Sequence, residues 1–355
     1  MSKIQIDTHI HMGCRTFNEN REYNWQPIDM KNFKFPQGKN ILVFGGNTTN
    51  RAEAANGNAK VVDRLITDEN RKKCNIYSFL YDTEPLSSST KYLREEYISE
   101  THLLYEKMIK PLLLDRVGNI KEKQGIEKVL KNLVLVSHCA GSDFVNIIID
   151  DIYQTLTEKY HPSIAEHLIS KLQYFAYAPN SLPNCKVTSC IITPFLDVSC
   201  SWAKSLNNVS DKRVDTDYPR GIVRKIFKAQ ESGDSFSTLE EAFKKDRLIS
   251  FKSEQSIYLI PSRINSNISV GDHSIDCLVK SNVLNSGTDF AQTATLLNYA
   301  SKLVINQFVS DSHLDFRAIY EKIVDKTYKS RPDESKLPKT NETISYSPII
   351  TDGIC

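Results

Sequence analysis

A cysteine stands between a strongly apolar strand and a long helix near the middle of the chain. The strand is predicted over residues 132–137, and Ser137-His138-Cys139-Ala140-Gly141 then leads into a helix that begins near Ala140. Small residues at 137 and 141 allow a sharp turn in which the helix packs back against its own strand. The side chain at the apex points out of such a turn, beside helical N–H groups whose partial positive charge favours a thiolate and an oxyanion. The spacing therefore predicts that Cys139 is a nucleophile.

This pattern resembles the nucleophile elbow G-x-S-x-G of the α/β-hydrolase superfamily, with Ser137 in place of the first glycine and Cys139 in place of the serine. Cysteine at the apex is similar to the variant in dienelactone hydrolase-like enzymes. The resemblance implies a hydrolase or acyltransferase that acts on an ester, thioester or amide through a Cys-His-Asp triad. The triad members should follow one another in the order nucleophile, acid, histidine. No cofactor is expected.

The resemblance also implies an oxyanion hole built from two backbone N–H groups. One belongs to the residue after the nucleophile, which is Ala140. The other comes from an earlier loop, and the predicted strand 40–44 ends in Gly45-Gly46, which is similar to the glycine-rich loop of these enzymes. Phe44 stands where such loops often carry histidine. The structural alternative for Gly45 and Gly46 is a tight turn between a strand and a helix.

Two pairs of residues are candidates for the acid and the base that the resemblance implies. Asp197 ends a predicted strand after the elbow helix, and His273 follows the last predicted strand, so we prefer this pair. The rival pair is Asp272 as the acid and His313 as the base, because His313 begins a final predicted helix. An aspartate that ends a strand in a turn, and a structural histidine, are the alternatives without catalysis.

We expect no role as catalytic base or metal ligand for three other histidines, His138, His9 and His11. His138 is next to Cys139, but neighbours on a sharp turn rarely face each other, so we expect His138 to pack rather than to act as the base. His9 and His11 alternate on a predicted strand over residues 4–10 and beyond, a pattern similar to the first strand of metal-dependent amidohydrolases. We prefer the interpretation that His9 and His11 belong to a polar N-terminal strand that caps the domain, and we expect no metal there.

The composition is that of an ordinary globular protein. Its 355 residues are 40% hydrophobic and 25% charged, and 45 basic against 43 acidic residues give a formal charge of +2. Lys and Arg are scattered along the sequence, so we expect no nucleic-acid partner. The eight cysteines contain no CxxC pair, which indicates free thiols in a reducing compartment.

The sequence shows neither a membrane span nor a secretory signal. No window approaches eighteen apolar residues, and the N-terminus lacks a charged stretch followed by an apolar one. We therefore expect a cytoplasmic protein, while export by a route that needs no such signal stays open.

Predicted strands alternate with predicted helices from residue 40 onward. This alternation predicts an α/β fold with a mostly parallel sheet and helices on both faces. The strands are expected at 40–44, 75–81, 132–137, 174–178, 186–195 and 256–261. The helices are expected at 53–66, 97–114, from 140 onward, and at 162–172, 289–308 and 314–325.

Composition shifts divide the chain into three parts. Residues 1–38 are expected to be an N-terminal leader packed on the core, residues 39–329 an α/β-hydrolase-like domain, and residues 330–355 a flexible tail. A charged, serine-rich insertion is expected at about 203–252. The expected partner is a small-molecule or acyl substrate. In the alternative interpretation the protein is a non-catalytic relative that binds a protein partner through the insertion.

Overall fold

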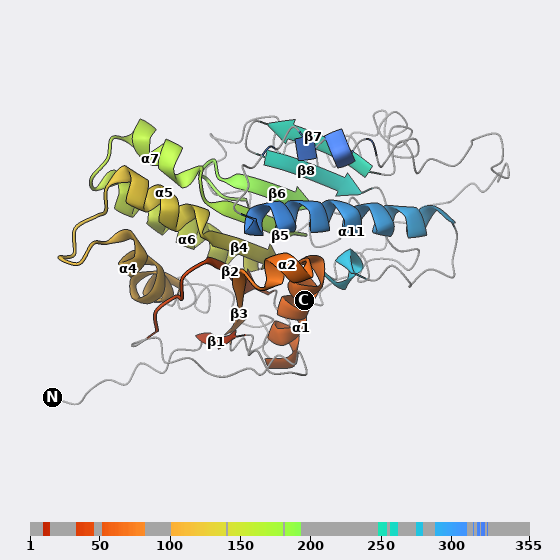
Figure 1. Ribbon diagram of the computed structural model, residues 1–355, viewed down its shortest axis with the longest axis horizontal. Coiled ribbons are helices and arrows are strands. Elements are labelled where there is room, and N and C mark those ends of the chain that lie inside the picture. The colour runs from red at the N-terminus through yellow and green to blue at the C-terminus, as the bar shows by residue number, and fades with distance from the viewer. Residues whose placement is uncertain are drawn as a thin grey trace, which may run out of the picture.

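The structure, a computed structural model, describes residues 10–14, 33–45, 52–81, 101–139, 141–179, 182–192, 248–253, 256–261, 275–279, 288–310, 315, 318–319, 321–323 and 325. These residues form one eight-stranded sheet with helices on both of its faces (Figure 1). The predicted α/β fold class is confirmed.

Six neighbouring strands of the sheet run parallel, in the order β3-β2-β4-β5-β6-β8. An antiparallel strand lies at each edge, β1 (Ile10–Cys14) beside β3 and β7 (Leu248–Ser253) beside β8. The parallel strands are β2 (Lys39–Phe44), β3 (Cys74–Tyr81), β4 (Leu133–His138), β5 (Gln173–Tyr177), β6 (Thr188–Ile192) and β8 (Ser256–Pro261). Strand β4, which leads to Cys139, has three strands on one side and four on the other.

The central strands are apolar because helices cover both of their faces. Successive side chains of a strand point to opposite faces of the sheet, so both sets must be apolar when both faces are covered. On β4, Val134 and Val136 belong to one buried cluster, and Leu133 and Leu135 belong to the other. All four side chains are at most 1% exposed.

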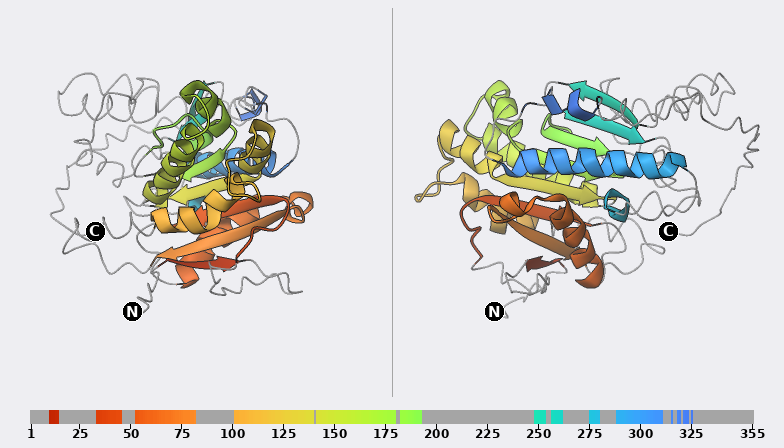
Figure 2. Two further views of the ribbon diagram at one scale, coloured as in Figure 1. Left: turned by 90° about the vertical axis from the view of Figure 1, so that its left-hand side faces the viewer. Right: turned by 45° about the vertical axis from the view of Figure 1, so that its right-hand side comes forward.

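The helices divide between the two faces. On one face α1 (Ala52–Leu65) and α11 (Thr288–Val309) pack on the sheet together with the short helix η4 (Ile275–Leu278). The other face is covered by the π-helical turn η1 (Tyr105–Ile109), α4 (Lys110–Leu113), α5 (Lys123–Lys131), α6 (Gly141–Thr157) and α7 (Pro162–Ile169). Figure 2 shows α11 lying across its face of the sheet.

Helix α6 is the helix that follows the elbow. Its apolar residues Val145, Ile148, Ile149, Ile152 and Leu156 recur every three to four positions, and all are 0% exposed. Such a wide apolar stripe is typical of a helix buried against a sheet. No described helix is both long enough and apolar enough to cross a membrane.

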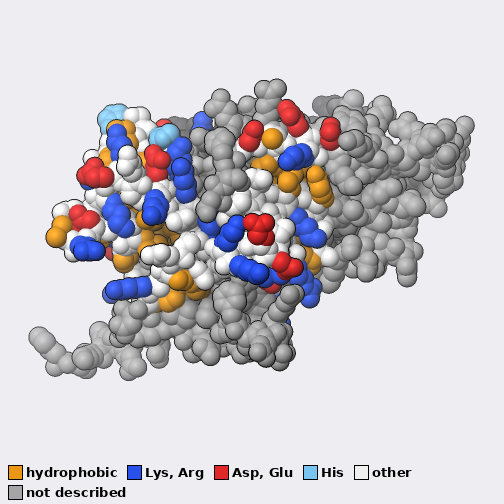
Figure 3. Space-filling view, viewed as in Figure 1, with side chains coloured by type: hydrophobic (Ala, Val, Ile, Leu, Met, Phe, Trp, Pro, Cys, Tyr) orange, Lys and Arg blue, Asp and Glu red, His pale blue; other side chains and the backbone are white. Residues whose placement is uncertain are grey.

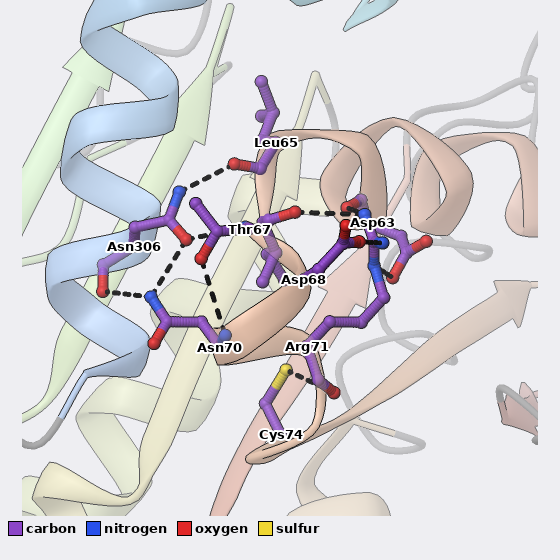
Figure 4. A network of polar contacts seen from close by, with 9 residues as sticks. Asp63, Leu65, Thr67, Asp68, Asn70, Arg71, Cys74 and Asn306 are labelled. Carbon is purple, nitrogen blue, oxygen red and sulfur yellow. Dashed lines mark hydrogen bonds and ion pairs between the residues drawn. The ribbon is translucent and has the colours of Figure 1, made fainter.

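The amide of Asn306 on α11 binds the turn between α1 and α2 (Asp68–Arg71), as Figure 4 shows. Its Oδ1 accepts hydrogen bonds from Thr67 N at 2.8 Å and Asn70 Nδ2 at 3.0 Å. Its Nδ2 donates to Leu65 O at 2.8 Å and to Lys302 O at 2.7 Å. Because α2 leads directly into β3, this contact fixes the end of α11 near the amino ends of the strands.

Four segments differ in detail from the expected elements. Helix α5 was not expected, because it is short and contains Gly125. The helix expected over 97–114 contains the π-helical turn η1. Residues 248–252, placed by the sequence at the end of the insertion, belong to β7, while 203–247 lie outside the described residues. Within the expected leader, residues 10–14 form the edge strand β1 of the sheet itself, and residues 1–9 are outside the described part.

Candidate functional site

Cys139 directly follows β4 and has a left-handed backbone conformation. Its φ is +52°, a value that non-glycine residues seldom adopt because the Cβ approaches the neighbouring carbonyl oxygen. The conformation costs about 1–2 kcal/mol relative to an ordinary backbone. It also turns the chain sharply enough for α6 to begin two residues later. Cys139 is partly exposed, so small molecules in solution can reach this turn.

Hydrogen bonds hold both backbone polar groups of Cys139. Its N–H donates to Tyr177 O on the neighbouring strand β5 at 3.3 Å. Its carbonyl oxygen accepts from Ser142 N at 3.1 Å and from Ser142 Oγ at 2.8 Å. Ser142 is fully buried, so it anchors the turn from inside the helix. These contacts maintain the strained backbone.

Gly141 has no room for a side chain. A Cβ atom there would lie 2.3 Å from Phe44 O and 2.6 Å from Gly45 O, at the carboxyl end of β2. Real Cβ atoms do not approach backbone oxygens so closely, and neither oxygen can rotate away. A residue without a side chain is therefore required at position 141 for the close approach of α6 to β2.

Ser137, the small residue two positions before Cys139, has a polar partner. Its hydroxyl lies 2.7 Å from the hydroxyl of Tyr174 on β5, and both residues are fully buried. Burial raises the pKa of Tyr174 above its usual range, which keeps its hydroxyl neutral. The hydrogen bond ties β4 to β5 below the elbow. The sequence pattern indicated a small residue here but gave no sign of Tyr174.

A second strained residue ends the neighbouring strand. Ala178 follows β5 with a φ of +46°, and its N–H donates to Ile192 O on β6 at 2.8 Å. Strained backbone is common at functional sites, where the surrounding structure must stabilise it. Cys139 and Ala178 thus follow adjacent strands at the same edge of the sheet. An alanine carries no sequence signal for this conformation, so sequence reasoning could not find it.

The connections that leave β2 and β4 go to opposite faces of the sheet. Strands β2 and β4 are hydrogen-bonded neighbours, but α1 packs on one face and α6 on the other. In open α/β sheets, ligands bind outside the carboxyl ends of the strands where successive connections diverge in this way. Cys139 and Gly45 lie at this point. It is the preferred place for a ligand in this architecture.

Only part of the predicted site belongs to the described residues. Cys139 and Gly45 are described, and they lie at the carboxyl ends of adjacent strands. The other predicted site residues lie outside the described residues, so the triad and the oxyanion hole stay predictions: Ala140, Gly46, Asp197, His273, Asp272 and His313.

His138 is the last residue of β4 and shares a face of the sheet with Val134 and Val136. Its ring centre is 6.1 Å from that of Tyr177, and the two rings are tilted by 32°. Tyr177 is fully buried, and His138 is partly exposed. The imidazole therefore packs on an aromatic ring at the carboxyl edge, on the face opposite to that of Ser137.

Four cysteines have described side chains, Cys74, Cys139, Cys185 and Cys190, and these free thiols are not equivalent. Cys74 and Cys190 are buried, and burial raises the pKa of the Cys190 thiol far above its usual value. Cys185 is partly exposed, as Cys139 is, but its Sγ lies 3.9 Å from Asp150 Oδ1. In this contact the Cys185 thiol donates to the carboxyl group. Cys139 is thus the described thiol best placed to react.

The described residues contain no group of three or more His, Cys, Asp or Glu side chains that could hold a metal ion. His9 lies outside them, and of His11 only the backbone, in the edge strand β1, is described.

No protein-family model matches the chain, and no curated protein matches its sequence.

Proposed function

We propose that the protein is an acyl-transfer enzyme, a hydrolase or acyltransferase of the α/β-hydrolase type, with Cys139 as its nucleophile. The observation that carries this proposal is the conformation of Cys139. A partly exposed thiol stands on a left-handed residue between a central parallel strand and a buried helix. This is the strand-turn-helix context in which the nucleophile elbow is recognised.

The proposed reaction has two steps. The Cys139 sulfur attacks the carbonyl carbon of an ester, thioester or amide, and a histidine takes the thiol proton. The carbon–heteroatom bond breaks, the histidine returns the proton to the alcohol, thiol or amine that leaves, and an acyl thioester remains on Cys139. Water or another nucleophile then attacks this thioester, gives its proton to the histidine, and releases the acyl group and the protonated thiol.

The contact between Gly141 and β2 supports the proposed oxyanion hole. The carboxyl end of β2 touches the first residue of α6, so the loop that starts at Gly45 leaves the sheet beside the elbow. In this type of enzyme the hole combines an N–H just after the nucleophile with one from the loop of the neighbouring strand.

Chain connectivity favours Asp197 and His273 over the rival pair. Asp197 follows the carboxyl end of β6, and His273 shortly precedes η4, whose residues Ile275 and Leu278 are buried against α1 and α11. Figure 1 and the right-hand view of Figure 2 show η4 at the end of the sheet toward which β4, β5, β6 and β8 point.

His313, the rival base, follows the opposite end of α11. That end is bound through Asn306 to the turn before β3, near the amino ends of the strands. A base needs to lie within hydrogen-bond reach of the nucleophile or of a bridging water. We therefore assign the base to His273 and the acid that orients it to Asp197.

The decisive experiment compares two cysteine variants in hydrolysis of p-nitrophenyl acetate and of a short acyl thioester. We expect Cys139→Ala to lose activity and Cys185→Ala, which removes the other partly exposed described thiol, to keep it. Full activity in Cys139→Ala would exclude the proposed mechanism. If neither ester nor thioester is hydrolysed by the native protein, the labelling test below decides whether a reactive nucleophile exists at all.

The labelling test measures alkylation of each cysteine by iodoacetamide near neutral pH. A thiol paired with an imidazole reacts faster than an ordinary thiol because more of it is thiolate. We expect Cys139 to be labelled faster than Cys185, and His273→Ala to remove this advantage while His313→Ala keeps it. Equal rates for the two cysteines would instead favour a non-catalytic protein that binds a partner.

A further inference from the structure

Lysines occupy the segments that lead into the parallel strands. Each of β2 to β6 has a lysine as its first residue or within two residues before it, although these lysines are far apart in the sequence. The described segments 33–39, 70–73, 131–132, 170–172 and 184–187 contain no Asp or Glu. Their lysines are Lys34, Lys39, Lys72, Lys73, Lys131, Lys171 and Lys186.

Hydrogen bonds between these segments bring the lysines side by side. Lys39 N donates to Lys73 O at 3.4 Å, Asn40 N to Asn132 O at 2.8 Å, and Thr188 N to Leu172 O at 3.0 Å. The Lys39 side chain is buried and donates to Lys131 O and, at 3.4 Å, to Gln173 Oε1. With neighbouring strands about 4.8 Å apart, a row across five strands is about 20 Å long. The fold thus gathers charge that is scattered in the sequence.

Local partners account for only part of this charge. Lys73 pairs with Glu69 at 2.8 Å, and Lys131 pairs with Glu127 at 3.8 Å. Lysines just after a helix also interact favourably with the helix dipole, an effect that falls off within one turn. Lys34, Lys72 and Lys186 are exposed, so the row keeps positive charge in contact with solvent.

Helix α5 extends the basic surface away from the strands. Lys123 and Lys128 on α5 are exposed, and Arg116 is exposed in the loop before it. Figure 3 shows Lys and Arg side chains gathered over this end of the molecule, with fewer acidic ones between them. We call the lysines of the strand entrances other than the buried Lys39, together with Arg116, Lys123 and Lys128, the basic surface.

A rigid turn beside the basic surface presents an apolar side chain to solvent. Val117 is 80% exposed and is the one large hydrophobic residue with such exposure among the described residues. Asp115 Oδ1 accepts from Val117 N and from Asn119 N, both at 2.9 Å, and Leu114 and Ile120 form a β-bridge at the base of the turn. In Figures 1 and 2 this loop projects from the end of the molecule at which the central strands begin.

We propose that the basic surface and Val117 bind the surface of a bilayer that contains anionic lipid headgroups. The lysines face the headgroup phosphates and carboxylates, and the valine enters the interfacial region. Several lysines near an anionic bilayer and an inserted apolar side chain contribute additively to binding. This inference is independent of the acyl-transfer proposal, because it uses residues at the opposite end of the strands from Cys139.

The residue types favour a bilayer over nucleic acid. Apart from Arg71, which pairs with Asp63 and Asp68, the basic residues of the strand entrances are lysines, which act as point charges. Arginine forms the bidentate contacts typical of phosphate and base recognition. Among the described residues no aromatic side chain is exposed as a platform on which a base could stack. An exposed valine at the tip of a rigid turn has no partner on a phosphate backbone, but it has one in a bilayer.

Co-sedimentation with vesicles tests the proposal with the full chain. The vesicles are phosphatidylcholine alone, or phosphatidylcholine with about 30% phosphatidylserine, in buffer of about 0.1 M ionic strength. We expect binding to the anionic vesicles only, and release as salt is added. Lys123→Glu with Lys128→Glu should weaken binding at least about 20-fold, and Val117→Asp about tenfold.

The matched control is Lys60→Glu with Lys302→Glu, which changes the net charge equally at exposed positions on α1 and α11. We expect this control to bind much more tightly than the α5 double variant. Equal weakening in both double variants would show a net-charge effect and overturn the proposal. Equal binding to both kinds of vesicle, or binding to duplex DNA but not to anionic vesicles, would overturn it as well.

Discussion

Gly141 at the start of α6 lies directly against Phe44 at the end of β2. A Cβ atom on Gly141 would be 2.3 Å from Phe44 O, and both groups belong to regular secondary structure. The contact fixes the start of α6 relative to β2. It therefore also fixes the turn at Cys139.

Replacement of Gly141 by alanine should destabilise the protein. The new Cβ would overlap backbone oxygens that cannot move independently, so α6 has to shift, at a cost of about 1–3 kcal/mol in the free energy of unfolding. Urea denaturation followed by circular dichroism measures this. The matched control is Gly57→Ala on α1, where a Cβ would meet nothing within 4 Å. Because alanine is the better helix former, this control should gain about 0.5–1 kcal/mol. Equal effects of the two changes would contradict the steric argument.

Glycine at position 139 should give a more stable protein than alanine. Both variants lack the thiol, but only glycine adopts a φ of +52° without strain, which makes an expected difference of about 1–2 kcal/mol in the free energy of unfolding. The measurement is again denaturant unfolding, with Cys139→Gly and Cys139→Ala side by side. If the alanine variant is the more stable one, the backbone at this position is not left-handed.

Asn306→Ala should loosen α11 from the α1–α2 turn. The change removes the acceptor of Thr67 N and the donor to Leu65 O, and we expect a loss of about 2–3 kcal/mol in the free energy of unfolding. Thermal or urea unfolding measures the loss. Lys302→Ala, one turn earlier on the exposed side of the same helix, should change stability by less than about 0.5 kcal/mol. An equal loss in the free energy of unfolding in both variants would show that the hydrogen bonds of the Asn306 amide do not stabilise the protein.

The Asp150 carboxyl should make stability depend on pH. Burial is the largest cause that raises its pKa above the ordinary 3.8, Asp151 raises it further, and the hydrogen bond from Asn184 opposes the shift. Because the folded protein holds this proton more tightly than the unfolded chain, the carboxyl stabilises most at low pH. Its contribution is lost as the pH rises from about 3.8 through the raised value.

Asp150→Asn, which keeps the shape but cannot ionise, should remove this decline. Urea unfolding at about pH 4 and about pH 7 measures it, and the advantage of the asparagine variant should grow toward the higher pH. Glu166→Gln, an exposed carboxyl on α7, is the control and should show no such trend. A constant difference between native protein and Asp150→Asn across this range would refute the assignment.

The sequence predicted the fold class and the sharp turn between β4 and α6 because both depend on local patterns. Alternating strands and helices define an α/β sheet, and a small residue two positions after Cys139 is required wherever a helix turns back on its strand. The prediction did not reach α5: its apolar residues Ile126, Val129 and Leu130 do recur at helical spacing, but the helix has only nine residues and contains a glycine. It also missed the two antiparallel edge strands: β1 pairs with the distant β3, whereas β7 forms a hairpin with β8 at the end of a segment that the composition placed in the insertion.

The finer features of the site depend on tertiary contacts. The hydrogen bond of Ser137 to Tyr174, and the strain at Ala178, arise because β4, β5 and β6 lie side by side. The lysines are far apart in the sequence and therefore looked scattered. Only the folded sheet places the segments before the strands, and their lysines, side by side. Asp197 and His273 remain predictions, since no described residue tests their roles.

Helix α11, which Asn306 binds to the turn between α1 and α2, comes late in the chain. Its position determines when each face of the sheet can be covered during synthesis. Among the described residues, the face with α6 draws its buried side chains from Leu42 to Ile191, whereas the face with α1 needs residues of α11 and reaches Ile323. Asn306 and Thr67 are 239 positions apart. A chain that emerges from the ribosome can therefore finish the first face while the apolar side chains of the second are still uncovered. Until α11 has been synthesised, that second face is the surface on which the nascent chain is open to chaperones and to aggregation.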